Sequence, residues 1–246
     1  MDNSYNIIFR DIYKSFGNNT VLQGLNLKIK RGETLVILGR SGCGKSVTLK
    51  ILLGLLYPDA GQVYFDGEEI TGMPEKKLVA IRKKIGMLFQ GSALFDSLTV
   101  GENVAFALAE HSTKTKDEIA DIVRINLQFV ELEGTENLMP SELSGGMKKR
   151  AALARAMAYQ PEVMLYDEPT TGLDPITATT INALIRKTQK EYNVTSIAVT
   201  HELDSGFSVA DRVAVMDSGQ ILEIGTIDEI KNSENEFVQT FIAGPK

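Results

Sequence analysis

The chain of 246 residues contains a single cysteine and no long apolar run. One cysteine cannot form an internal disulfide, which fits a protein kept in a reducing cytoplasm. No segment reaches the roughly 18 uninterrupted apolar residues that a membrane-spanning helix needs. Residues 1–10 lack the charged-then-apolar layout of a secretory signal. We therefore expect a cytoplasmic chain without a membrane span of its own.

An excess of positive charge is also missing, because 26 Lys and Arg side chains stand against 32 Asp and Glu. The net charge of -6 argues against a nucleic-acid-binding protein, which usually carries a basic face. The composition, 43% hydrophobic and 24% charged, is ordinary for a globular protein. The length allows one large α/β domain, or a core with an inserted subdomain, with a substantial apolar interior.

A phosphate-binding loop is the clearest feature that the sequence does contain. Residues 39–46 follow the pattern G-x-x-x-x-G-K-S, between an apolar strand at 35–38 and an apolar-periodic stretch at 47–56. Glycines let backbone N–H groups turn toward a nucleotide, while the lysine reaches the β- and γ-phosphate oxygens and the serine hydroxyl binds Mg²⁺. The predicted ATP-binding residues here are Gly39, Arg40, Ser41, Gly42, Cys43, Gly44, Lys45, Ser46 and Val47. The thiol of Cys43 is expected to fill space in the loop and to have no catalytic role.

Apolar periodicity predicts a parallel sheet with both faces covered. Buried strands are expected at 35–38, 85–89, 163–166, 196–199 and 212–216, and a helix at 177–192. Alternating apolar and polar residues at 25–30 predict an antiparallel layer ahead of the phosphate loop. Hairpin turns are expected at 66–67 and 217–220, and short helices after 228. Helical spacing from 91 to 159 indicates a helical subdomain inserted between core segments 1–90 and 160–246.

Two carboxylates follow the apolar strand at 163–166. Asp167 and Glu168 then stand at the carboxyl end of a buried strand, the edge at which open α/β sheets bind ligands. We expect Asp167 to hold the same Mg²⁺ as Ser46, and Glu168 to orient or deprotonate the water that attacks the γ-phosphate. The alternative interpretation is an acidic loop that caps the next helix.

A second anion-binding helix start is predicted at residues 144–146. Ser144 is an N-cap residue, and Gly145 and Gly146 open an alanine-rich helix whose first N–H groups and positive dipole end favour an anion. Because the loop at 39–46 already holds phosphates, this start is expected to serve the nucleotide of a partner chain. The alternative is an ordinary capped helix.

Together these motifs resemble the ATP-binding-cassette ATPases over essentially the whole chain. The matching elements are the Walker A loop at 39–46, the Q-loop residue Gln90, the signature at 143–147, Walker B ending at Asp167 and Glu168, the D-loop at 172–174 and the switch residue His201. The resemblance implies a P-loop NTPase fold: a RecA-like parallel core, an antiparallel β layer and an inserted helical subdomain. It also implies ATP hydrolysis with ATP and Mg²⁺.

The resemblance further assigns roles to individual residues. Two subunits are expected to pack head to tail as a homodimer, so that Ser144, Gly145 and Gly146 of one cover the ATP held by Lys45 of the other. Gln90 is expected to sense Mg²⁺ and water, and His201 to contact the γ-phosphate. Phe16 matches the position that stacks on adenine, with Tyr13 as a neighbouring candidate; both are alternatively core residues.

The branch of the family follows from two segments. Met147, where the commonest signature has glutamine, and residues 89–97 resemble the ATPase subunits of Mla-type transporters. Those subunits work with a membrane permease and an MCE-domain protein to move phospholipids or related lipids. The resemblance implies a peripheral subunit at the cytoplasmic face of the inner membrane, docked through Ala93, Leu94 and Phe95. A buried core explains those three residues equally well.

Three other functions are alternatives to lipid transport. The ATPase of an amino-acid or other small-solute importer would share every catalytic residue. A soluble cassette ATPase acting on DNA or ribosomes would usually carry tandem cassettes or long coiled-coil insertions, which this chain lacks. A small-molecule kinase or a GTPase gives no reason for the segment 143–147.

Overall fold

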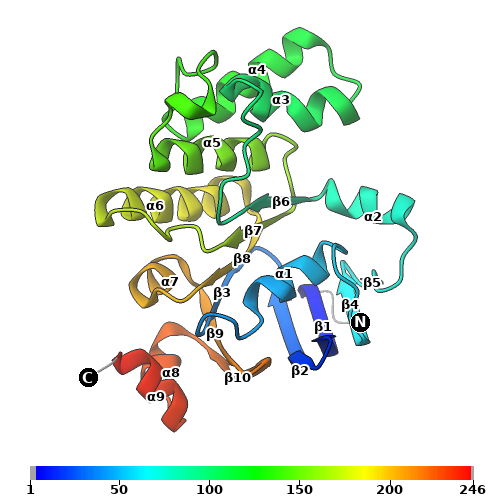
Figure 1. Ribbon diagram of the computed structural model, residues 1–246, viewed down its shortest axis with the longest axis vertical. Coiled ribbons are helices and arrows are strands. Elements are labelled where there is room, and N and C mark those ends of the chain that lie inside the picture. The colour runs from blue at the N-terminus through cyan, green and yellow to red at the C-terminus, as the bar shows by residue number, and fades with distance from the viewer. Residues whose placement is uncertain (1–3, 245–246) are drawn as a thin grey trace.

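A six-stranded sheet forms the centre of the computed structural model, which describes residues 4–244 (Figure 1). Its strand order is β10-β9-β3-β8-β7-β6, with β10 antiparallel at one edge and the other strands parallel. The strands are β3 (Thr34–Leu38), β6 (Ile85–Leu88), β7 (Val163–Asp167), β8 (Thr195–Thr200), β9 (Arg212–Asp217) and β10 (Gln220–Gly225). The parallel sheet predicted from the apolar runs is therefore confirmed.

A second, antiparallel sheet has the order β2-β1-β4-β5. Its strands are β1 (Tyr5–Phe16), β2 (Asn19–Lys30), β4 (Ala60–Phe65) and β5 (Glu68–Glu69). The turn between β4 and β5 places Asp66 and Gly67 in the left-handed region, at φ 51° and 78°, as a tight hairpin requires. The antiparallel layer predicted at 25–30 is thus real, but the sequence analysis missed β1 and the first half of β2.

Different layers cover the two faces of the parallel strands. Leu35 and Ile37 of β3 pack toward the antiparallel sheet and α1 (Lys45–Leu52). Val36 and Leu38 pack toward α5 (Gly145–Met157), α6 (Pro175–Tyr192) and α7 (Leu203–Val209). The helix expected over 47–56 ends early at Leu52, because Gly54 turns the chain with φ 62°.

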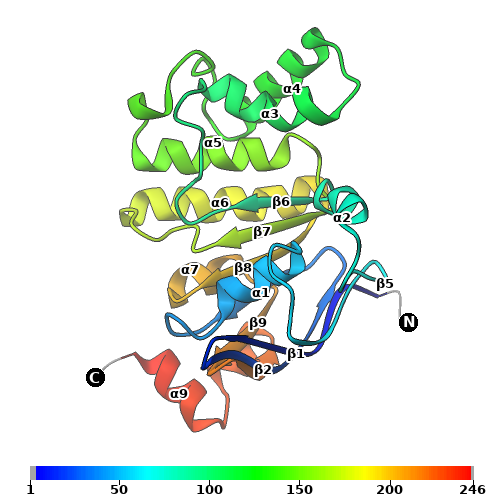
Figure 2. The same cartoon turned by 45° about the vertical axis from the view of Figure 1, so that its right-hand side comes forward.

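The segment 91–159 is helical, as predicted, and lies at one end of the molecule (Figure 2). Its helices are α3 (Val100–His111), α4 (Lys116–Phe129), the 3-10 turn η1 (Pro140–Glu142) and α5. Thr99 and Thr115 are the N-cap residues at which α3 and α4 begin, and each forms a capping box. The described structure also contains α2 (Glu75–Arg82), α8 (Ile227–Lys231) and α9 (Glu236–Ala243). Across residues 4–244, no helix combines the length and apolar character needed to cross a membrane.

Candidate functional site

A cavity of about 360 Å³ lies where β3, β6, β7 and β8 end beside the start of α1. The phosphate loop and α1 contribute Ser41, Gly42, Gly44, Lys45, Ser46 and Val47 to its lining. The rest of the lining comes from Val21, Gln90, Glu168 and His201. The parallel register of the strands therefore gathers predicted site residues from distant parts of the chain at one edge of the sheet.

The phosphate loop has a shape that only glycine permits at several positions. Gly42 and Gly44 have φ values of 82° and 112°. A Cβ on Gly39 would lie 2.3 Å from the carbonyl oxygen of Met216. Gly44 is the N-cap of α1 and supplies no side-chain cap. The first N–H groups of α1 thus have no capping side chain, which suits an anion at this helix start.

Lys45 is almost fully buried in the cavity wall, with 5% of its surface exposed. Its Nζ donates to the carbonyl oxygens of Gly39, at 2.7 Å, and Arg40, at 3.2 Å. The same nitrogen lies 3.4 Å from Oε1 of Glu168. A positive charge so placed, beside free N–H groups, is matched to a phosphate oxygen.

Ser46 and Asp167 meet across the floor of the site. The Ser46 hydroxyl donates to Oδ1 of Asp167 at 2.7 Å, and the exposed side chain of Gln90 lines the same cavity. A hydroxyl, a carboxylate and an amide are oxygen donors of the kind that Mg²⁺ prefers. Within residues 4–244, no group of three or more His, Cys, Asp and Glu forms a separate metal site. Magnesium fits this donor set, because it is usually held by one or two carboxylates together with substrate phosphates.

Glu168 has its carboxylate fixed from several sides. Oε2 lies 2.9 Å from Nδ1 of His201 and accepts a 3.1 Å hydrogen bond from the Thr171 hydroxyl. The Glu168 backbone adopts φ 48°, and its N–H donates to the carbonyl of Val199 at 2.9 Å. A left-handed non-glycine residue at a site of this kind indicates strain that the surrounding contacts hold in place. The sequence analysis missed Thr171.

Lys149 of α5 is a second buried cation that the sequence analysis missed. Its Nζ donates to the carbonyl oxygens of Gln90, at 2.6 Å, and Glu168, at 3.4 Å. Burial lowers the pKa of Lys149, and the negative charges of Asp167, Glu168 and Glu202 oppose that shift. The only signal in the sequence is a basic run, 148–150, in an alanine-rich helix, and such a run also suits a solvated face.

Several predicted residues lie outside the cavity. Ser144 caps α5, and its hydroxyl accepts from the N–H of Met147 at 3.3 Å. A Cβ on Gly145 would lie 3.8 Å from Leu173, and one on Gly146 would lie 2.4 Å from Thr177, so this helix start abuts the D-loop turn of its own chain. Residues 144–146 do not line the cavity that Lys45 lines.

Phe16 and Tyr13 of β1 are 47% and 48% exposed, so the alternative interpretation of both as core residues is wrong. The Phe16 ring lies 5.4 Å from Nζ of Lys14 and does not line the cavity. Cys43 is buried beneath the loop, where burial raises the pKa of its thiol. The Arg40 guanidinium points instead to α9, 5.2 Å from the ring centroid of Phe237.

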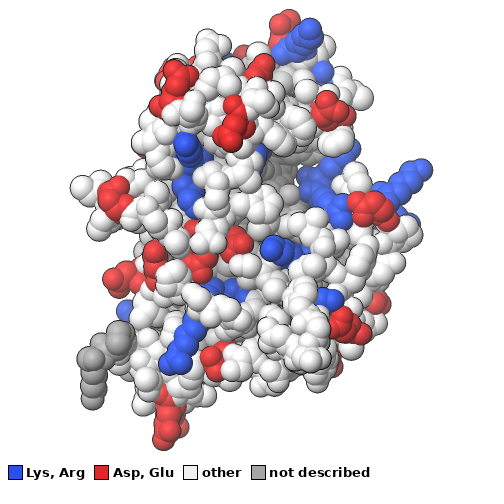
Figure 3. Space-filling model, in the orientation of Figure 1, with Lys and Arg blue, Asp and Glu red and all other residues white. Residues whose placement is uncertain are grey.

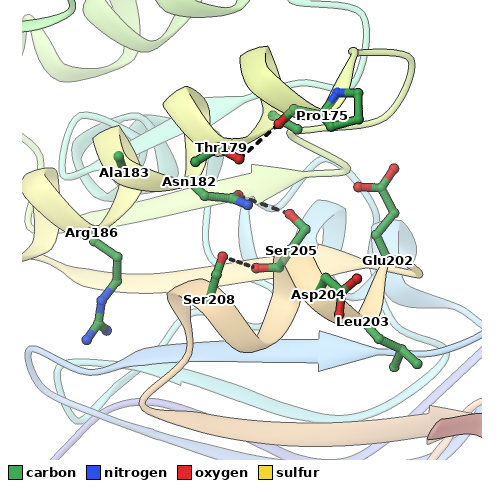
Figure 4. Close-up of a pocket in the computed structure, with 11 residues that line it drawn as sticks. Pro175, Thr179, Asn182, Ala183, Arg186, Glu202, Leu203, Asp204, Ser205 and Ser208 are labelled. Carbon is green, nitrogen blue, oxygen red and sulfur yellow. Dashed lines mark hydrogen bonds between the residues drawn. The ribbon is translucent and has the colours of Figure 1, made fainter. Parts of the chain in front are cut away.

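A polar hollow of about 650 Å³ lies between α6 and α7 (Figure 4). Its hydroxyl and amide groups bond to one another: Ser205 to Asn182 at 3.0 Å, and Ser208 to the carbonyl of Ser205 at 2.7 Å. Thr179 donates to the carbonyl of Pro175 at 2.9 Å. These bonds join Asn182, Ser205 and Ser208 to one another or to the backbone, and no described residue that lines the hollow also lines the cavity at the phosphate loop.

An apolar groove of about 690 Å³ lies between α2, β6, α3 and α5. Its apolar lining includes Leu55, Val79, Phe89, Ala93, Phe95 and Phe106, and Arg82, Lys83 and Arg155 add positive charge. Figure 3 shows basic side chains gathered over α2 beside a hollow in the surface. Phe95 is 45% exposed, whereas Leu94 packs against the core. Of the three apolar residues at 93–95, Leu94 therefore belongs with the core.

The chain is similar in sequence and in fold to known proteins. Residues 22–171 match the ABC transporter family. Over 93% of its length the chain is 40% identical to the intermembrane phospholipid transport system ATP-binding protein MlaF of Haemophilus influenzae, of which it covers 86%. It is 43% identical to the chloroplastic protein TRIGALACTOSYLDIACYLGLYCEROL 3 of Arabidopsis thaliana, covering 96% of this chain and 72% of that protein. A dimeric ATP-binding cassette solved in a post-hydrolysis state with ADP and phosphate has a TM-score of 0.83 and 32% identity, covering 90% of this chain and 98% of that one.

Proposed function

The chain belongs to the ABC transporter family and is an ATPase, and we propose that it drives a membrane permease that moves phospholipids or related lipids. The observation that supports the catalytic part is that Lys45, Ser46, Glu168 and His201 line one cavity, with Asp167 bonded to Ser46. Hydrolysis at such a site depends on positioning and on electrostatic stabilisation of the transferred phosphoryl group.

Each residue then has a defined part in hydrolysis. Lys45 and the N–H groups of the phosphate loop bind the β- and γ-phosphates, and Glu168 polarises the attacking water. His201, held against Glu168, contacts the γ-phosphate. Ser46, Asp167 and Gln90 would hold Mg²⁺, which would supply positive charge that offsets the charge on the phosphate oxygens. Phe16 stacks on the adenine ring, which its exposure at the end of β1 allows.

The second helix start supports a composite site formed by two chains. Ser144 and Gly145 are exposed, and the N-terminus of α5 does not face the cavity of its own chain. We infer that Ser144, Gly145 and Gly146 cover the ATP of a second copy. The dimeric structure of the similar cassette, solved with ADP and phosphate, supports an assembly of two chains.

The apolar groove supports docking of the permease. An apolar hollow beside exposed Phe95 fits an amphipathic helix from a membrane partner. One wall belongs to segment 91–159, the proposed helical subdomain, and another to α2. Docking there would hold the chain at the cytoplasmic face of the inner membrane through the permease. The permease would in turn work with an MCE-domain protein.

The lipid substrate is supported by the name of a similar protein and by the segments around Gln90 and Met147. MlaF of Haemophilus influenzae is named for intermembrane phospholipid transport. This chain carries Met147 in its signature and the sequence Phe-Gln-Gly-Ser-Ala-Leu-Phe-Asp-Ser at 89–97.

The test is to purify the full chain with its membrane partners and analyse the lipid that accompanies them. We expect a permease, an MCE-domain protein and phospholipid, and ATP-dependent lipid movement after reconstitution. Copurification with a solute-binding protein, with hydrolysis stimulated by an amino acid, would instead assign a small-solute importer.

A single groove variant tests docking separately. Phe95→Asp places a charge in the groove and should release the chain from the permease, while ATP binding persists. Ile125→Asp is the matched control, because Ile125 is 49% exposed on α4 and does not line the groove. Retention of the permease by the Phe95→Asp chain would contradict docking at this groove.

A further inference from the structure

Lys149 is buried next to the nucleotide cavity, yet it does not line that cavity. Its side chain is 4% exposed and leaves α5 one turn after the helix start. Both hydrogen bonds from its ammonium group go to backbone carbonyls, those of Gln90 and Glu168. Burying a lysine ammonium group costs free energy unless it makes such bonds, so we asked what the buried charge contributes to the site.

The two acceptors belong to different segments that end side by side. β6 pairs in parallel with β7, with Leu88 opposite Tyr166, so Gln90 and Glu168 follow neighbouring strand ends. Beyond those ends the two segments diverge, one toward the apolar groove and the other toward α6. The ammonium group of Lys149 is therefore a bridge between the two segments at the point where they separate.

Both bridged segments have backbone conformations that need support. Glu168 has φ 48°, and beyond Gln90 the residues Ser92 and Ala93 have φ 62° and 52°. None of these three residues is glycine, so each left-handed conformation must be held by its surroundings. Arg155, six positions further along α5, holds the second segment by donating to the carbonyls of Ala93, at 2.5 Å, and Ser92, at 3.0 Å.

We propose that Lys149 is a positioning residue that fixes the carboxylate of Glu168 by bonding the carbonyls of Gln90 and Glu168 to one ammonium group. This inference rests on the proposed role of Glu168 in hydrolysis. Arg155 extends the same connection to Ala93 in the apolar groove. A displacement of segment 90–93 by a docked helix therefore reaches Glu168 through Lys149.

The test compares three full-length variants in ATP hydrolysis and ATP binding. Lys149→Met keeps the length of the side chain and removes its donors, and Lys149→Arg keeps donors and charge. Lys187→Met is the matched control, because Lys187 also donates to a backbone carbonyl, that of Phe129 at 3.4 Å, away from the cavity lining. Wild type and Glu168→Gln are measured alongside.

We expect Lys149→Met to lower kcat about 10- to 100-fold, the scale of a displaced catalytic group, with KM changed less than about twofold. Lys149→Arg should recover most of kcat, and Lys187→Met should match wild type. A fall in kcat with little change in KM indicates positioning. A general loss of structure would also lower ATP affinity and the unfolding temperature.

Wild-type kcat in Lys149→Met would overturn the proposal, as would an equal loss of kcat and ATP affinity in a chain that still unfolds cooperatively. If Lys149→Met fails to fold, Lys149→Gln takes its place, and the same two outcomes decide. Failure of the proposed catalytic function has a different signature, since Glu168→Gln would then hydrolyse ATP as fast as wild type.

Discussion

The starts of α1 and α5 are both suited to an anion, but their surroundings differ. At α1 the N-cap is Gly44, which provides no side-chain cap, and Lys45 and Glu168 close the site around it. At α5 the hydroxyl of Ser144 caps the helix, and the flanking surface is exposed. The same local physics thus occurs beside a cluster of charged side chains in one case, and in the other at an exposed helix start that we propose serves a second chain.

The largest effect on hydrolysis is expected from a substitution at Glu168, beside the start of α1. Glu168→Gln keeps the size and hydrogen bonding of the side chain but removes its charge, so hydrolysis should fall about 10²- to 10⁴-fold. ATP binding should persist, because the phosphate loop is untouched. Phosphate release and equilibrium ATP binding measure the two effects. Near-normal turnover would remove Glu168 from the chemistry.

The second helix start is tested by Ser144→Arg. Its long charged side chain would occupy the space where a second chain brings its nucleotide, so ATP-dependent dimers of the Glu168→Gln chain should disappear. Hydrolysis by the Ser144→Arg chain should fall about 100-fold, the scale on which misplacement acts. Thr115→Arg is the control, because Thr115 caps α4 in the same way. Light scattering with and without ATP reports dimers, and persistent dimers would contradict a two-chain site.

Lys45→Ala should affect binding at the first site and leave the second site intact. The substitution removes a charge-assisted contact of about 1.5–3 kcal/mol, or roughly 10- to 100-fold in ATP affinity. Titration with a fluorescent ATP analogue measures the change. An unchanged affinity would show that Lys45 remains bonded to the carbonyls of Gly39 and Arg40 when nucleotide binds.

The smallest effect separates capping from function at α5. Ser144→Ala and Thr115→Ala each remove one N-cap hydrogen bond, both 3.3 Å long, and each should cost about 1 kcal/mol of unfolding free energy. Only Ser144→Ala should also slow hydrolysis. Denaturant unfolding and steady-state rates give both quantities, and equal rates in the two variants would mean that Ser144 is only a cap.

The sequence anticipated the parts of the site that are encoded locally. A glycine pattern specifies the phosphate loop because Gly42 and Gly44 need positive φ, whatever packs around them. Apolar runs of strand length specify β3 and β7, and carboxylates after β7 fall at the ligand-binding edge. The strand β1 was not predicted, because its apolar run covers only Ile7 to Phe9 and is followed by the polar residues Arg10 and Asp11.

Contacts between distant segments were beyond the reach of sequence patterns. Whether Leu94 and Phe95 face the core or the groove depends on how α3 and α5 pack beside β6. In the structure Leu94 packs against the core and Phe95 lines the groove, although both are apolar in sequence. Even within one turn, residue types did not indicate the contact of Thr171 with the carboxylate of Glu168, three residues earlier, because it depends on the fold of the turn after β7.

By itself the sequence determined the phosphate loop, the parallel strands and the family, because these depend on residue types at short fixed spacings. Only the tertiary structure decided that Lys149, one of three consecutive basic residues, is buried against Gln90 and Glu168. The physical reason is that the burial of a side chain and its hydrogen-bond partners depend on the parallel register of β6 and β7 and on how α5 packs against these strands.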